Sequence, residues 1–76
     1  MNIVIYTTNT CPYCVRAKQW LKNQNYEYNE ISLEDPALRA EFKEKNPTLK
    51  TVPQIFVDDV HIGGYQELVK SHLANA

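Results

Sequence analysis

The chain lacks the features of disulfide-stapled, membrane-spanning and nucleic-acid-binding proteins. It has only two cysteines, Cys11 and Cys14, and a bridge between them would close too short a loop to stabilise the fold much. Its longest unbroken apolar run, Ile3–Tyr6, is far shorter than the ~20 residues of a membrane span. The net charge is only −1, so no basic field favours a nucleic acid or an anionic membrane as partner.

Glycine and proline are also scarce, at two and four residues, which excludes a disordered or low-complexity chain. With 43% hydrophobic and 11% aromatic residues, the composition supplies the core of one small domain that spans residues 1–76. The chain does not start with a basic segment and a long apolar segment, as a secretory signal does. Because two closely spaced cysteines also suit a reducing compartment, we expect a cytoplasmic protein.

The order of local patterns predicts an α/β fold. The helix-containing crossover between the first two strands predicts that they are parallel. The two-residue turn Asp58-Asp59 predicts an antiparallel hairpin between the last two strands. Thr10 is the expected N-cap of the first helix, with Pro12 in its first turn. The expected elements are strands over 3–7, 26–31, 54–57 and 60–62, and helices over 15–23, 36–45 and 65–73.

Both cysteines belong to one C-x-x-C motif, Cys11-Pro12-Tyr13-Cys14, between the first strand and the first helix. A helix N-terminus supplies unpaired N–H groups and about half a positive charge, which favour a thiolate. Since the thiolate is the form that attacks disulfides, this placement predicts a redox site. The motif can also supply half of a zinc site. However, the only further ligand candidates besides carboxylates, the two histidines, lie far outside the usual finger spacing.

Three segments, in their order and spacing, resemble those of a dithiol glutaredoxin of the thioredoxin-like superfamily. They are Cys-Pro-Tyr-Cys at 11–14, Thr-Val-Pro-Gln-Ile-Phe-Val at 51–57 and His-Ile-Gly-Gly-Tyr at 61–65. The resemblance covers essentially the whole chain. It implies a four-stranded mixed sheet of order 2-1-3-4 flanked by three helices, and a cis peptide bond between Val52 and Pro53.

The resemblance implies a glutathione-dependent oxidoreductase that reduces protein disulfides and glutathione mixed disulfides. Cys11 would be the attacking nucleophile, and Cys14, on the apolar side of the helix, the resolving thiol with the higher pKa. Glutathione would be the reducing co-substrate, without a tightly bound cofactor or a metal. For its glycyl carboxylate, Arg39 and Lys50 are both candidate cations. The residues implied to bind glutathione are Tyr13, Thr51, Val52, Pro53, Gly64, Tyr65, Gln66 and Arg39.

The implied partners are glutathione and disulfide-containing protein substrates, ribonucleotide reductase being the family's example, and the implied state is a monomer. Thr8 stands where many relatives carry lysine, and Gln66 where many carry an acidic or hydroxyl residue. This leaves open a glutaredoxin-like electron donor that is reduced by a thioredoxin reductase. A third alternative is a [2Fe–2S] carrier in which Cys11 of two chains and two glutathiones ligate the cluster. Pro12 and the competing thiol of Cys14 disfavour it.

Overall fold

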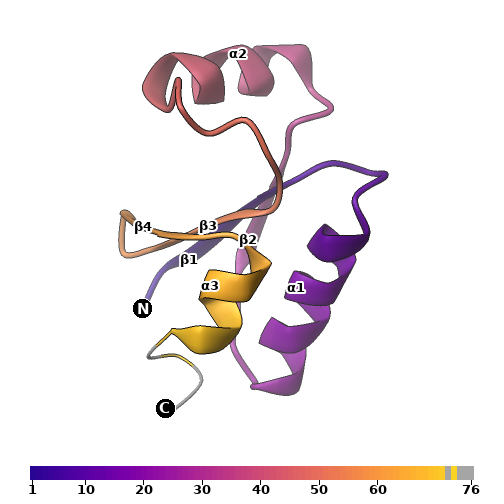
Figure 1. The fold of residues 1–76 in the computed structure, drawn as a ribbon, viewed down its shortest axis with the longest axis vertical. Helices are drawn as coiled ribbons and strands as arrows, with labels where there is room; N and C mark the ends of the chain where they lie inside the picture. Colours follow the sequence, from indigo (N-terminus) through magenta and orange to yellow (C-terminus); the bar gives the residue numbers. More distant parts are fainter. Residues whose placement is uncertain (72, 74–76) are drawn as a thin grey trace.

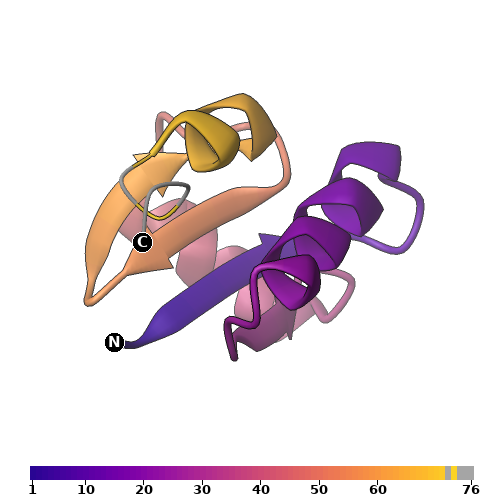
Figure 2. The same ribbon diagram turned by 90° about the horizontal axis from the view of Figure 1, so that it is seen from below.

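The computed structural model describes residues 1–71 and 73 and forms one four-stranded sheet with helices on both faces. Helices α1 and α3 lie side by side on one face, and α2 lies toward one end of the sheet, where its Phe42 contacts Tyr6 of the first strand (Figures 1 and 2). The elements are β1 (Ile3–Thr7), α1 (Pro12–Asn23), β2 (Asn29–Ser32), α2 (Pro36–Lys45), β3 (Gln54–Val57), β4 (Val60–Gly63) and α3 (Tyr65–Lys70).

The strand order in the sheet is β2-β1-β3-β4, as the resemblance to glutaredoxins implies. Strand β1 is parallel to β2 and antiparallel to β3, and β3 and β4 form an antiparallel hairpin. Asp58 and Asp59 make the hairpin turn with φ values of 50° and 67°. Two consecutive positive φ angles match the right-handed twist of the flanking strands, which is why a tight hairpin adopts them. The thioredoxin-like fold that the resemblance implies is confirmed.

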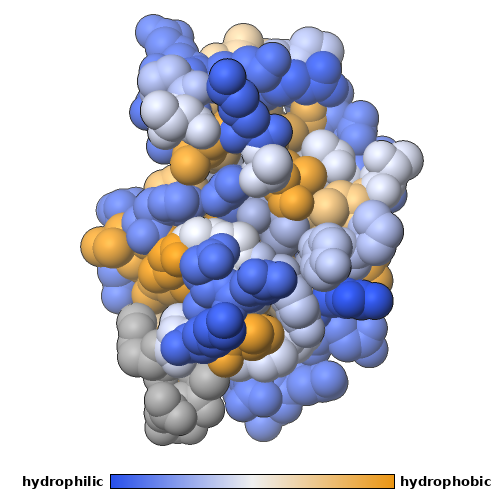
Figure 3. All heavy atoms as spheres, viewed as in Figure 1, coloured by the Kyte–Doolittle hydropathy of each residue, from blue (hydrophilic) through white to orange (hydrophobic). Residues whose placement is uncertain are grey.

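The core lies between the sheet and the pair α1 and α3. Alternate residues of β1 point to this side, so Ile3 and Ile5 are buried against Leu21 of α1 and Leu68 of α3. Each such side chain stabilises the fold by about 1.5–3 kcal/mol through burial. Figure 3 shows that hydrophobic residues on the outer surface in this view lie in separate patches among hydrophilic ones. The buried apolar side chains between the sheet and these two helices hold α1 and α3 in a fixed position on the sheet.

The predicted second strand starts too early, because β2 begins only at Asn29. Asn25 has a φ of 63°, and the backbone N–H of Tyr26 bonds to the carbonyl of Leu21 at 2.9 Å. The Tyr26 hydroxyl also donates to the Leu73 carbonyl at 2.9 Å. The residues before β2 therefore close the end of α1, although their alternating pattern suggests a strand.

Two helix boundaries also differ from the prediction. Helix α1 begins at Pro12 rather than at residue 15, and its N-cap is Cys11, not Thr10, with an extended backbone and no side-chain capping bond. Helix α3 ends at Lys70 rather than at residue 73. Leu73 is nevertheless buried at 1% exposure, so its burial does not require a longer helix. His72, one of the two histidines weighed as zinc ligands, lies outside the described residues.

Candidate functional site

The two cysteines are free thiols with different access to solvent. Cys11 is half-buried at the N-cap of α1, whereas Cys14, one turn inside the helix, is only 1% exposed. The Cys11 thiol donates a hydrogen bond to the carbonyl of Val52 at 3.3 Å. Only Cys11 can therefore meet an incoming disulfide directly.

Burial raises the pKa of the Cys14 thiol to about 11, and the neighbouring Cys11 adds to this rise. A hydrogen bond with the Thr8 backbone and the charge of Lys18 act in the opposite direction but are outweighed. The raised pKa of Cys14 agrees with its predicted place on the apolar side of α1, where it is buried. Protonated and buried, Cys14 is suited to act second.

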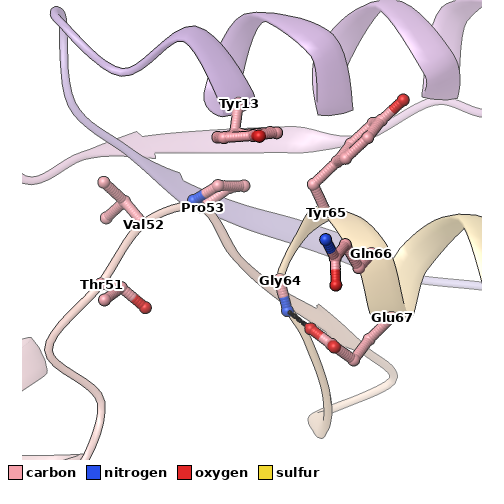
Figure 4. A pocket seen from close by; sticks show the side chains of 8 residues that line it. All are labelled: Tyr13, Thr51, Val52, Pro53, Gly64, Tyr65, Gln66 and Glu67. Atoms are coloured by element: carbon pink, nitrogen blue, oxygen red, sulfur yellow. Dashed lines mark hydrogen bonds between the residues drawn. The ribbon is translucent and has the colours of Figure 1, made fainter.

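A recess of about 250 Å³ opens next to the loop that contains Val52 (Figure 4). It is shared by the start of α1, the loop before β3 and the start of α3. The Val52–Pro53 peptide bond in that loop is cis, as predicted. Val52 also accepts the hydrogen bond from Cys11, so the Cys11 thiol lies at the edge of the recess. The lining residues are Tyr13, Thr51, Val52, Pro53, Gly64, Tyr65, Gln66 and Glu67.

Aromatic rings and close backbone contacts shape this recess. The rings of Tyr13 and Tyr65 lie 5.8 Å apart between centroids and form its upper and right-hand walls in Figure 4. At its floor, a Cβ atom on Gly64 would lie 3.3 Å from the Pro53 carbonyl oxygen. A glycine at this position therefore lets the start of α3 approach the loop before β3.

Glu67 is the lining residue that the sequence prediction missed. Its Oε1 accepts a hydrogen bond from the Gly64 N–H at 2.8 Å, the dashed line in Figure 4. An N-cap followed three positions later by glutamate is a known pattern at helix starts. Gly64 and Glu67 have this spacing, so the pattern could have identified the contact. This contact places the Glu67 carboxylate on the α3 side of the recess.

Arg39 is the one predicted glutathione-binding residue that the structure does not bring to the recess. It lies on α2, and its Nε donates to the Leu33 carbonyl at 2.7 Å. Lys50, the other candidate cation, is exposed and directly precedes Thr51 of the lining. The other seven predicted residues line one recess.

His61 is exposed, and its Nε2 lies 2.7 Å from Oε1 of the buried Gln54. The Gln54 amide donates in turn to the Thr51 carbonyl at 2.9 Å. These bonds hold the loop before β3 in place, and they give His61 a structural contact instead of a metal-binding one. Within residues 1–71 and 73, no three His, Cys, Asp or Glu side chains are grouped as a metal site. No helix in this part of the chain is long and apolar enough to cross a membrane.

Comparison with known proteins agrees with this geometry. The family model described as glutaredoxin matches residues 3–62. The chain belongs to the glutaredoxin family. It is 46% identical over 67 residues to a glutaredoxin of Pseudomonas aeruginosa, covering 87% of this chain and 79% of that one. With glutaredoxin 3 of Escherichia coli K12 it shares 43% identity over 67 residues, covering 88% and 81% of the two chains.

Solved glutaredoxins have the same fold. The structure of glutaredoxin 1 from Francisella tularensis complexed with cacodylate is 41% identical, with a TM-score of 0.77, covering 97% of this chain and 93% of that one. A buckwheat glutaredoxin–glutathione complex is 26% identical, with a TM-score of 0.78, covering 96% and 69%. Membership of the glutaredoxin family implies a thiol–disulfide redox function for this chain.

The raised pKa of Cys14 predicts how the resolving step of this glutaredoxin depends on pH. The reacting form is the thiolate, whose fraction grows with pH below the pKa. The largest cause of the raised pKa is the burial of Cys14 one turn inside α1, not its neighbour Cys11. We expect the closing rate to rise about tenfold per pH unit from about pH 6 to about pH 8. Acid quenching of a Cys11–glutathione mixed disulfide, followed by mass spectrometry, measures this rate. A rate that does not change with pH would contradict the buried, protonated thiol.

Proposed function

We propose that this glutaredoxin is a glutathione-dependent thiol–disulfide oxidoreductase that reduces protein disulfides and glutathione mixed disulfides. The observation that carries the proposal is the place of the Cys11 thiol, 3.3 Å from the carbonyl of Val52 at the edge of the recess. The other half of a mixed disulfide on Cys11 would lie in or beside this recess. The buckwheat relative, whose structure is a glutathione complex, supports glutathione as that half.

The recess offers groups that fit the γ-glutamyl end of glutathione. The first hydrogen bond of α3 runs from the Leu68 N–H to the Gly64 carbonyl. The N–H groups of Tyr65 and Gln66 precede it and have no acceptor within the helix, so they can bind the γ-glutamyl carboxylate. The carboxylate of Glu67 supplies a negative charge near the γ-glutamyl ammonium, which the neutral Gln66 does not.

The remaining parts of glutathione face the loop before β3. The backbone of Val52 can pair with the cysteinyl backbone as one strand pairs with another. The glycyl carboxylate then points toward the start of this loop. Lys50 is exposed there next to Thr51, whereas the Nε of Arg39 is bonded to the Leu33 carbonyl. Of the two candidate cations, Lys50 is better placed.

In the dithiol route, the Cys11 thiolate attacks one sulfur of a protein disulfide, and the other sulfur leaves with the electron pair and gains a proton. Cys14 then loses its proton and attacks the Cys11 sulfur, which releases the second substrate thiol and forms a Cys11–Cys14 disulfide. Two glutathione molecules reduce this disulfide and become glutathione disulfide. In the monothiol route, Cys11 takes glutathione from a mixed disulfide, and a second glutathione regenerates the thiol.

The testing experiment is the reduction of a glutathione mixed disulfide, coupled to glutathione, glutathione reductase and NADPH. We expect turnover in this system and little with a thioredoxin reductase. Turnover with the thioredoxin reductase alone would overturn the proposal in favour of a dedicated electron donor. An iron–thiolate absorbance in anaerobically purified protein would instead favour the cluster carrier.

We further propose that the protein acts as a monomer in the cytoplasm on protein disulfides such as that of ribonucleotide reductase.

A further inference from the structure

Helix α1 carries an uneven charge. Its twelve residues include Arg16, Lys18 and Lys22 but no acidic residue, although the whole chain has a net charge of −1. Lys18 is neutralised by Glu30 of β2 at 2.9 Å. Among the described residues, Arg16 forms no ion pair, and its guanidinium lies 5.2 Å from the ring centroid of Tyr13. A free cation therefore lies next to the motif that holds the nucleophile.

A second recess, of about 370 Å³, lies along α1 beside the recess at Cys11. Tyr65 lines both recesses, and its ring faces that of Tyr13 at 5.8 Å. Its lining residues are Val15, Arg16, Gln19, Trp20, Asn23 and Tyr65. The two recesses are thus neighbours that share one aromatic wall.

The second recess has the chemistry of a peptide-binding surface. Trp20, which stacks on Tyr26 at 6.5 Å between centroids, provides an apolar base, and Val15 is 55% exposed at the edge. The side-chain amides of Gln19 and Asn23 can donate to and accept from a peptide backbone. Since the lining contains Arg16 and no acidic residue, an acidic side chain has a complementary partner there.

We propose that this second recess binds an acidic segment of the protein substrate while the substrate is joined to Cys11. The proposal rests on the proposed function, because it needs a mixed disulfide on Cys11. A tripeptide such as glutathione can be held by the first recess, but a polypeptide continues beyond its cysteine. A chain that leaves the first recess past Tyr65 enters the second and meets Arg16.

The test uses the Cys14→Ser protein, in which a mixed disulfide on Cys11 persists. The protein is loaded with glutathione and brought to equilibrium with single-cysteine peptides whose flanking residues are glutamate, glutamine or lysine. Mass spectrometry gives the ratio of peptide-bound to glutathione-bound protein. Repeating the measurement with R16E in the same background cancels the intrinsic reactivity of each peptide thiol. We expect the preference for glutamate over lysine peptides to fall about two- to fivefold, as for an exposed ion pair.

The matched control is K43E, which makes the same change of net charge on an exposed lysine of α2. An unchanged preference in R16E, or an equal change in K43E, would overturn the docking proposal. If the protein forms a normal mixed disulfide with glutathione but shows no charge preference among the peptides, the docking proposal is overturned and the proposed function is not. Failure to form a mixed disulfide with glutathione or with any peptide would overturn the proposed function, and the docking site with it.

Discussion

Replacing Cys11 with serine is expected to lower the reduction of protein disulfides and of glutathione mixed disulfides by at least about 10³-fold. A serine hydroxyl is not ionised at neutral pH and cannot form the mixed disulfide. Cys14 cannot replace it, because this thiol is 1% exposed and its pKa is raised to about 11. The measurement is NADPH consumption in the coupled assay with each substrate.

Cys14→Ser is the matched variant, since it removes the other thiol of the same motif. We expect it to abolish the dithiol route but to retain the reduction of glutathione mixed disulfides, because the monothiol route uses only Cys11. Loss of that reaction in C14S, with activity remaining in C11S, would reverse the assigned roles. Circular dichroism of both variants distinguishes lost chemistry from a lost fold.

Much of the fold follows from local patterns because propensity and burial agree there. The β-branched run of β1 and the helix at 36–45 have the predicted bounds, since apolar spacing and the flanking turns indicate the same element. The prediction failed around Tyr26. There the alternating pattern competes with the local bond from Tyr26 to Leu21 that ends α1, and with a tertiary bond to Leu73, which no local pattern contains.

The functional site, like the fold, has parts that were predictable from the sequence and parts that were not. The two cysteines and the residues around Pro53 and Gly64 were predictable, because each belongs to a short motif with a backbone requirement. Arg39 was chosen because the resemblance to glutaredoxins implies a cation on the second helix, but the position of a long side chain depends on contacts between segments distant in sequence. Its Nε bonds to the Leu33 carbonyl, a contact that becomes visible only when the loop after β2 is placed. Glu67 was missed although its spacing from Gly64 was visible.

Gly63→Ala is expected to destabilise the protein, because Gly63 has a φ of 122°, a conformation that L-residues with side chains rarely adopt. A Cβ there would also lie 2.6 Å from the Cγ of Glu67, so α3 would have to shift. Unfavourable backbone geometry alone costs about 1–3 kcal/mol. In a domain of this size each kcal/mol lowers Tm by roughly 4–8 °C. Thermal unfolding followed by circular dichroism measures the change.

Gly64→Ala is the neighbouring control, since Gly64 has a φ of −92°, which alanine adopts without strain. Its Cβ would meet the Pro53 carbonyl oxygen at 3.3 Å, inside the lining of the recess. We therefore expect G64A to act mainly on binding, with a raised KM for glutathione and a small change in Tm. We expect G63A to act mainly on stability, with a lowered Tm and a small change in KM. Adding Glu67→Ala to G63A should recover only part of the stability, because it removes the contact with the Cγ of Glu67 but leaves the Cβ at 2.7 Å and the backbone strain. Full recovery would show that the contact with the Cγ, and not the positive φ, is what requires glycine at this position.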